Sequence, residues 1–120
     1  MIVRELLCHT APMAGSWLSE SVIANPMSIY PDYWERRSSW FGPMTAAVIE
    51  AVLDDGTRGF GFVGCGKGLA AKAIVDEQMR MLTVGRSALD TETLYDQLYR
   101  ASLFYGRGGI TQAVISGIDI

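Results

Sequence analysis

One short turn sequence constrains the arrangement of strands in the first half of the chain. The sequence Asp-Asp-Gly-Thr at residues 54–57 separates an apolar run at residues 44–53 from a Gly- and Phe-rich run at residues 59–63. Asp-Gly between two such runs is a strong signal for a tight turn, so the two runs are predicted to form a β-hairpin. Residues 2–8 are predicted to add a strand, which makes a three-stranded antiparallel β-meander within residues 1–64.

The pattern changes to a helical period in the second half of the chain. Apolar side chains recur at helical spacing in residues 69–82 and again in residues 90–105, which predicts a helix in each segment. Glycines follow both segments, as is common at helix ends. A third helix is predicted over residues 111–120, where the sequence is apolar nearly all round and is expected to be buried on all sides. The predicted fold class is α+β, with a β-meander followed by about three helices over residues 67–120.

Length and composition limit the classes of protein that fit this sequence. The chain of 120 residues is one domain in size, and 49% of its residues are hydrophobic, which is enough to build a core. The net charge of −3 argues against a nucleic-acid partner, and no apolar run approaches the ~18 residues of a membrane span. Residues 1–7 lack the apolar region of a signal peptide, and Cys8 and Cys65 are too few for a disulfide framework. We therefore expect a cytoplasmic protein with free thiols.

Residues 9–42 show no sustained periodicity and contain several Pro, Gly and Ser residues, which indicates a loop. A loop of roughly 30 residues in a compact domain is usually a lid or a binding loop. It is also rich in aromatic residues, namely Trp17, Tyr30, Tyr33, Trp34 and Trp40. Arg36 and Arg37 carry the planar guanidinium that suits a carboxylate ligand, although a solvated charge cluster is the simpler explanation.

Two glycine motifs lie between the hairpin and the first predicted helix. Residues 59–64 match the G-x-G-x-x-G pattern of dinucleotide-binding folds, but their first glycines fall inside a predicted strand that belongs to a hairpin. Residues 61–68 nearly match a phosphate-binding loop, but Gly68 stands where a Ser or Thr hydroxyl must reach magnesium. We interpret both motifs as one glycine-rich loop between a strand and a helix, whose backbone N–H groups are available to face a ligand.

The single histidine of the chain, His9, follows Cys8 at the end of the first predicted strand. Neighbouring residues of a strand point to opposite faces, so a Cys–His nucleophile pair is not expected. A zinc site is not expected either, because Cys65 is the only other nitrogen or sulfur ligand that the sequence offers nearby. The simpler explanation for His9 is a solvated side chain at a strand end.

Several segments together resemble a known family. Residues 113–120, Ala-Val-Ile-Ser-Gly-Ile-Asp-Ile, look like the last helix of the N-terminal domain in the mandelate racemase and muconate-lactonizing branch of the enolase superfamily. Residues 54–61 resemble that family's hairpin tip and third strand, and residues 84–86 resemble the segment after its first helix. Within the family, residues 25–39 and 103–109 are similar to segments of L-rhamnonate dehydratases.

The resemblance implies that residues 1–120 form an N-terminal capping domain, and that the protein is expected to continue into a (β/α)8 barrel, which this chain lacks. It also implies that the long first loop and a second lid loop close over an acid-sugar substrate. The residues of that second loop are Gly64, Cys65, Gly66 and Lys67. Arg37 matches an arginine that contacts the substrate in this subfamily, and Trp17 and His9 are further substrate-binding candidates. His9 precedes Trp17 at a spacing that differs from that of the family's histidine.

The parent that the resemblance implies is an acid-sugar dehydratase of the L-rhamnonate dehydratase type, a lyase that is expected to be a homo-oligomer. Such an enzyme removes the proton α to a carboxylate and eliminates the β-hydroxyl as water, which gives a 2-keto-3-deoxy acid. The family's Mg²⁺, its ligands and its general base all belong to the barrel. This chain is therefore expected to hold no metal and no catalytic residue, and to be inactive alone. The alternatives are a racemase or cycloisomerase of the same superfamily, a free-standing oligomerising or binding domain, and a small nucleotide-binding protein.

Overall fold

The computed structural model describes residues 1–13, 26–33 and 41–120. Its strands form one antiparallel sheet, in which the second strand lies between the other two. The strands are β1 (Val3–Pro12), β2 (Thr45–Leu53) and β3 (Arg58–Val63). The helical elements are η1 (Pro26–Ile29), η2 (Pro31–Tyr33), α2 (Gly68–Ile74), the π-helical η3 (Val75–Met79), α3 (Arg80–Thr83), α4 (Thr91–Ala101) and α5 (Ile110–Asp119). The predicted α+β fold, a three-stranded antiparallel sheet followed by helices, is confirmed.

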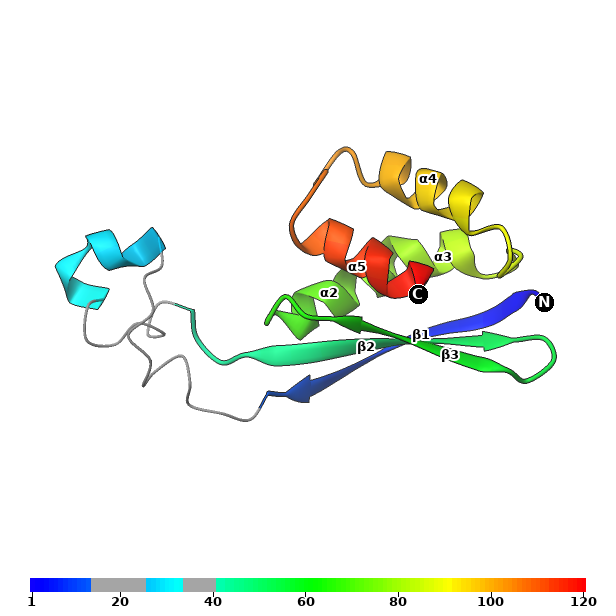
Figure 1. The fold of residues 1–120 in the computed structure, drawn as a ribbon, viewed down its shortest axis with the longest axis horizontal. Helices are drawn as coiled ribbons and strands as arrows, with labels where there is room; N and C mark the ends of the chain where they lie inside the picture. The colour runs from blue at the N-terminus through cyan, green and yellow to red at the C-terminus, as the bar shows by residue number, and fades with distance from the viewer. Residues whose placement is uncertain (14–25, 34–40) are drawn as a thin grey trace.

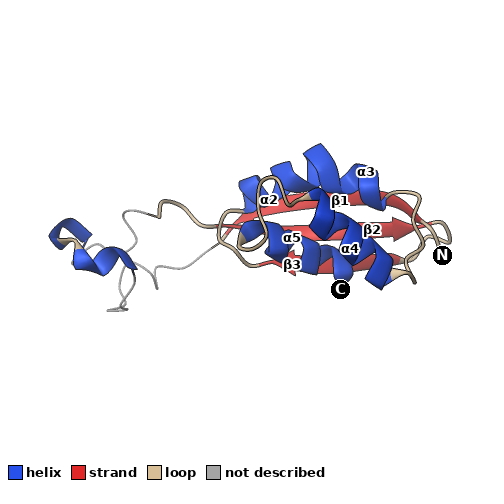
Figure 2. Ribbon diagram, turned by 90° about the horizontal axis from the view of Figure 1, so that it is seen from above, coloured by secondary structure: helices blue, strands red, loops and turns tan. Residues whose placement is uncertain are grey.

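The helices that follow the sheet cover one of its faces (Figures 1 and 2). α2 contacts β1 and β2, and α5 contacts β3 and β2, so these two helices form the layer next to the sheet. α4 lies farther out and packs against α5 and α3 (Figure 1). The sheet and the helices therefore share one core between them, as expected for an α+β domain.

That core is built from alternate residues of each strand. Leu6 and Cys8 of β1, Ile49 of β2 and Val63 of β3 are buried against the helices. The helices contribute the buried side chains of Ala71, Val75, Met79, Leu98, Val114 and Ile115. The two-residue period of the strands thus places one set of side chains in the core and leaves the other set on the outer face of the sheet.

The outer face of the sheet is not covered by any helix of the described residues (Figure 1). Phe60 and Phe62 of β3 lie on it, with 59% and 57% of their surface exposed. Glu50 lies opposite Phe60 in the sheet and is only 6% exposed, because neighbouring side chains of the same face surround it. This face thus combines exposed aromatic rings with a buried carboxylate.

The first strand and the first helix differ in extent from their predictions. β1 continues to Pro12 rather than ending at Cys8, because its pairing with β2 runs on to the partners Pro12 and Thr45. Cys8 and His9 therefore lie within the strand and not at its end. The helix predicted over residues 69–82 is a continuous helical run from Gly68 to Thr83, formed by α2, η3 and α3.

The prediction that the third helix is buried on all sides is wrong. Val114, Ile115 and Gly117 of α5 are buried, but Ser116 and Asp119 are exposed. Gln112, Ser116 and Asp119 recur at spacings of four and three residues, so one stripe of this helix is polar and faces away from the core. Neither α5 nor any other helix among the described residues is long and apolar enough to cross a membrane.

Candidate functional site

The predicted second lid loop, residues 64–67, lies at the end of the sheet where β1 ends and β2 begins. The N–H of Met13 donates to the carbonyl of Met44 at 3.1 Å, which ties together the two described ends of the long first loop. The N–H of Thr45 donates to the carbonyl of Gly66 at 3.0 Å, which ties the second loop to the start of β2. The two loops that the sequence predicts to form a lid thus leave the sheet at the same end.

Lys67 and Phe41 join these two loops through their side chains. The ammonium of Lys67 lies 4.0 Å from the centroid of the Phe41 ring, and it also donates a hydrogen bond to the Phe41 carbonyl. Gly66 has a φ of 71°, and a Cβ there would lie 3.1 Å from the Phe41 ring. The Phe41 ring therefore packs closely against the Gly66 backbone, and the positive φ there favours glycine.

The glycines that imitate a phosphate-binding loop have a packing role. A Cβ on Gly68 would lie 2.4 Å from the carbonyl oxygen of Ala46, so α2 begins in direct backbone contact with β2. The N–H of Gly68 donates to Thr45 Oγ1 at 2.8 Å and is therefore already paired. Gly59 and Gly61 lie inside β3, as the sequence predicted. Both motifs thus resolve into a strand, a loop and a helix start that pack against the sheet.

The structure separates Cys8 from His9 as expected for neighbours in a strand. Cys8 is buried under the helices, and this burial raises the pKa of its thiol. Cys65 is partly exposed in the second lid loop, and both thiols are free. No cysteine–histidine pair forms from these residues.

His9 belongs to a charged cluster on the outer face of the sheet. Its Nε2 lies 2.8 Å from Glu50 Oε2, and Arg58 Nη1 donates to Glu50 Oε1 at 2.6 Å. The hydrogen bonds from His9 and then from Arg58 lower the pKa of the Glu50 carboxyl, which outweighs the opposing effect of its burial. Glu50 was not predicted from the sequence to belong to a site, although a lone glutamate within an apolar strand is a signal for one.

The remaining substrate-binding candidates, Arg37 and Trp17, lie outside the described residues. Their roles stay predictions, as does a contact between His9 and a substrate. Among the described residues no group of three or more His, Cys, Asp or Glu side chains lies close enough to hold a metal ion.

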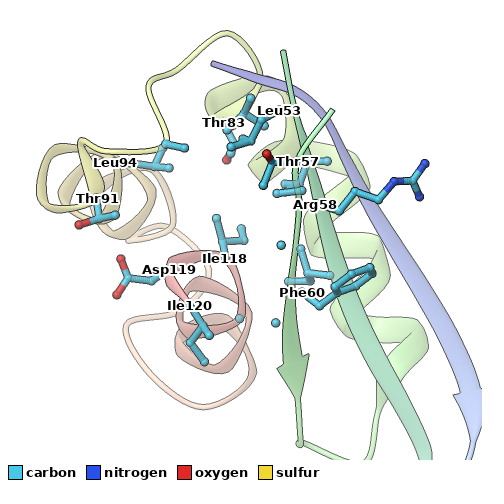
Figure 3. A pocket seen from close by; sticks show the side chains of 18 of the residues that line it. Leu53, Thr57, Arg58, Phe60, Thr83, Thr91, Leu94, Ile118, Asp119 and Ile120 are labelled. Atoms are coloured by element: carbon cyan, nitrogen blue, oxygen red, sulfur yellow. The ribbon is translucent and has the colours of Figure 1, made fainter. Parts of the chain in front are cut away.

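A groove of about 230 Å³ opens at the other end of the sheet, between the hairpin tip, α4 and α5 (Figure 3). Leu53, Leu94 and Ile118 give it an apolar lining, with Thr91 and Asp119 among its polar residues. The side chain of Arg58 points away from the groove (Figure 3). Because the groove adjoins the hairpin tip, it is separate from the end of the sheet that carries the two loops.

No protein-family model matches the chain. A protein of Caldivirga maquilingensis with the provisional name L-rhamnonate dehydratase is 36% identical over 99 residues, which is 82% of this chain and 24% of that protein. The crystal structure of L-rhamnonate dehydratase from Gibberella zeae matches with a TM-score of 0.76 and 34% identity, over 98% of this chain and 30% of that one. The crystal structure of rhamnonate dehydratase from Gibberella zeae complexed with Mg matches with a TM-score of 0.76 and 31% identity, over 98% of this chain and 32% of that one.

A mandelate racemase/muconate lactonizing protein from Paracoccus denitrificans matches with a TM-score of 0.66 and 18% identity, over 99% of this chain and 25% of that one, and shares the fold. The chain spans about a quarter to a third of the length of these relatives. The match to the dehydratases runs through the sheet and the helices alike, since it covers nearly the whole chain. The chain therefore belongs to the mandelate racemase/muconate-lactonizing branch of the enolase superfamily and corresponds to its N-terminal capping-domain region.

Proposed function

We propose that this chain is the substrate-capping domain of a Mg²⁺-dependent acid-sugar dehydratase of the L-rhamnonate dehydratase type, and that it is not catalytic alone. The observation that carries the proposal is the contact between the long first loop and the loop at residues 64–67. Both loops leave the same end of the sheet, and they meet through Lys67 and Phe41. The similarity to an L-rhamnonate dehydratase at 34% identity supports this substrate class.

The work of the chain in this proposal is to bind and enclose the substrate. Residues 41–44 and 64–67 form the described base of the lid, from which the longer loop extends over the substrate. The guanidinium of an arginine such as Arg37 is suited to hold a carboxylate or hydroxyl groups by paired hydrogen bonds, and the ring of a tryptophan such as Trp17 is suited to pack on the apolar side of a sugar. A closed lid excludes water and strengthens the electrostatic interactions inside the site.

The reaction itself is assigned to a partner (β/α)8 barrel domain. Removal of the proton α to the carboxylate and loss of the β-hydroxyl convert an acid sugar into a 2-keto-3-deoxy acid and one water molecule. The general base and the Mg²⁺ ligands come from the barrel in this proposal. In this proposal the described residues shape the site and exclude water from it.

Exposed apolar side chains on the helical side support a partner domain. Leu103, Phe104 and Tyr105 are consecutive and exposed, and Phe104 is fully so. The apolar groove between α4 and α5 adds a concave surface on the same side of the sheet. Clustered exposed apolar surface is typical of an interface. We assign these surfaces to contact with the barrel and, in a homo-oligomer of the cytoplasmic enzyme, with neighbouring subunits.

The test is an activity screen of the full-length protein with Mg²⁺ and a panel of acid sugars, read out as formation of a 2-keto-3-deoxy acid. Dehydration of an acid sugar supports the proposal, and Arg37→Ala is expected to lower kcat/KM at least about tenfold, the scale of one lost charged hydrogen bond. Arg36→Ala is the matched control and is expected to leave kcat/KM nearly unchanged. Isomerisation without water loss would instead assign a racemase or cycloisomerase, and loss of activity in both variants alike would remove the specific role of Arg37.

A further inference from the structure

Lys67 has a backbone that is fixed by two rigid elements. It forms a bridge with Thr45 at the start of β2, and its carbonyl accepts the N–H of Ala71 in the first turn of α2 at 3.1 Å. A side chain that starts from such a position is anchored to the sheet and to a helix at once. A group that the Lys67 ammonium contacts is therefore held at a defined position relative to the core.

The ammonium of Lys67 is directed at the point where the long first loop returns to the sheet. It contacts both the ring and the carbonyl of Phe41, across 26 residues of sequence. Gly42 follows with a φ of 72°, a conformation that glycine adopts at no steric cost, and a Cβ there would lie 4.0 Å from the Lys67 ammonium. The returning chain thus passes close to the Lys67 ammonium.

We propose that Lys67 is a positioning residue that holds residues 41–44 and 64–67 together, so that the bases of the two lid loops move as one unit. The inference rests on the proposed capping function for its catalytic consequence, but the coupling itself is a property of this chain. A cation over an aromatic face and a charged donor on a carbonyl are each stabilising, and here one side chain makes both contacts to one residue.

The coupling predicts how an unliganded protein responds when the contact is removed. Lys67→Met keeps a similar side-chain length but loses the charge and the donor, whereas Lys67→Arg keeps a cation that can stack and donate. Hydrogen–deuterium exchange in the full-length protein is expected to speed up on the order of tenfold in Lys67→Met, both in residues 41–48 and in residues 62–68, the scale of one lost charged hydrogen bond. Lys67→Arg is expected to stay within a few-fold of the wild type.

Lys72→Met, in the helix that directly follows Lys67, is the matched control. The ammonium of Lys72 pairs with Asp76 at 2.7 Å on the exposed side of α2, so its loss removes the same charge without touching Phe41. Exchange in both loop segments is expected to stay at the wild-type rate. Wild-type exchange in Lys67→Met, or an equal increase in Lys72→Met, would overturn the proposal.

A milder variant keeps the proposal testable if Lys67→Met fails to fold. Phe41→Leu removes the ring but leaves the carbonyl that accepts from Lys67. A coupled unit predicts faster exchange in both segments, although by less than in Lys67→Met. Faster exchange confined to residues 41–48 overturns the coupling, because the second loop would then be held independently of the first.

The catalytic consequence is read from steady-state kinetics with the acid sugar that the screen identifies. If Lys67 only positions the lid, Lys67→Met is expected to raise KM several-fold and to leave kcat within about twofold of the wild type. The reason is that the substitution weakens substrate binding and does not affect the chemical step. A fall in kcat at unchanged KM would contradict this positioning role. The exchange measurement needs no substrate, so a failed dehydratase screen leaves the coupling intact, and a failed coupling leaves the dehydratase proposal intact.

Discussion

Gly61 and Gly117 meet backbone to backbone where α5 crosses β3. A Cβ on Gly61 would lie 1.7 Å from the carbonyl oxygen of Gly117 and 2.6 Å from its carbonyl carbon. In the other direction, a Cβ on Gly117 would lie 3.0 Å from Val63 Cγ2 and 3.2 Å from Ile49 Cδ1. The helix rests on the strand without side chains between the two backbones at this point, so the pair sets the depth at which α5 packs.

The first prediction follows from the different space available for a side chain at Gly61 and at Gly117. Gly61→Ala is expected to lower the free energy of unfolding by about 2–3 kcal/mol, because α5 must shift to admit the methyl group. Gly117→Ala is expected to cost less, because a Cβ there meets side-chain methyl groups that have to move by only a few tenths of an ångström, and because alanine favours the helix by about 1 kcal/mol over glycine. Urea unfolding measures both changes.

Gly59→Ala is the matched control for the first prediction. Gly59 lies two residues before Gly61 in the same strand, and no atom lies within 4 Å of the Cβ it lacks. We expect a change within about 0.5 kcal/mol, as for ordinary surface substitutions. Equal losses in Gly59→Ala and Gly61→Ala would show that strand propensity, and not the contact with α5, sets the cost.

These same glycines show which parts of the fold local sequence patterns predict and which they do not. The Asp-Gly turn and the two-residue period located the hairpin, and the helical period located the helices, because both signals are encoded within a few residues. The close contact of Gly61 with Gly117 is encoded in two segments more than fifty residues apart. No local pattern carries it, so Gly61 stood out in the sequence only as part of a false nucleotide motif.

The candidate site was predictable in part for a similar reason. Gly64, Cys65, Gly66 and Lys67 were expected to form a loop near the long first loop, and the structure places this loop at the shared end of the sheet. The contact between Lys67 and Phe41 was not predicted, because it depends on where a chain of more than thirty residues returns to β2. Family resemblance supplied the two loops, and the structure supplied the residue pair that joins them.

The second prediction concerns the pH dependence of stability around Glu50. Hydrogen bonds from His9 and Arg58 lower its pKa in the folded protein below the ordinary value, so the charged carboxylate stabilises the fold above that ordinary value. This stability is lost as the pH falls from the ordinary carboxyl range of about 4.3 through the lower pKa of the folded protein. We expect Glu50→Gln to flatten the stability profile in that acid range, as measured by urea unfolding at a series of pH values.

Glu92→Gln gives the comparison for Glu50. Glu92 is an exposed residue in the first turn of α4, away from the cluster on the outer face of the sheet. Its loss is expected to leave the acid part of the stability profile close to that of the wild type. A Glu50→Gln profile that parallels the wild type through the acid range would mean that the cluster contributes nothing to folding.

The third prediction uses the two thiols as probes of the core and of the loop at residues 64–67. Cys8 is buried, and its raised pKa leaves less of the reactive thiolate, whereas Cys65 is partly exposed in the loop. We expect a thiol reagent to modify Cys65 at least about tenfold faster than Cys8 at neutral pH. Mass spectrometry of the two peptides measures the rates. If Cys8 and Cys65 react at equal rates in the native protein, and these rates match those of the protein unfolded in urea, a closed core around Cys8 is contradicted.

The last prediction concerns the π-helical turn in the middle of the first long helical run. Met79 ends η3 with no exposed surface and packs in the core between the sheet and the helices, whereas Met81, two residues on in α3, is 75% exposed. Met79→Ala is expected to lower the free energy of unfolding by about 2–5 kcal/mol through the cavity it leaves, and Met81→Ala by less than about 0.5 kcal/mol. Urea unfolding of the two variants tests this difference. Helical periodicity in a sequence does not distinguish an α-turn from a π-turn. A larger loss of stability in Met81→Ala than in Met79→Ala would contradict the π-helical turn, because it would mean that Met81 and not Met79 faces the core.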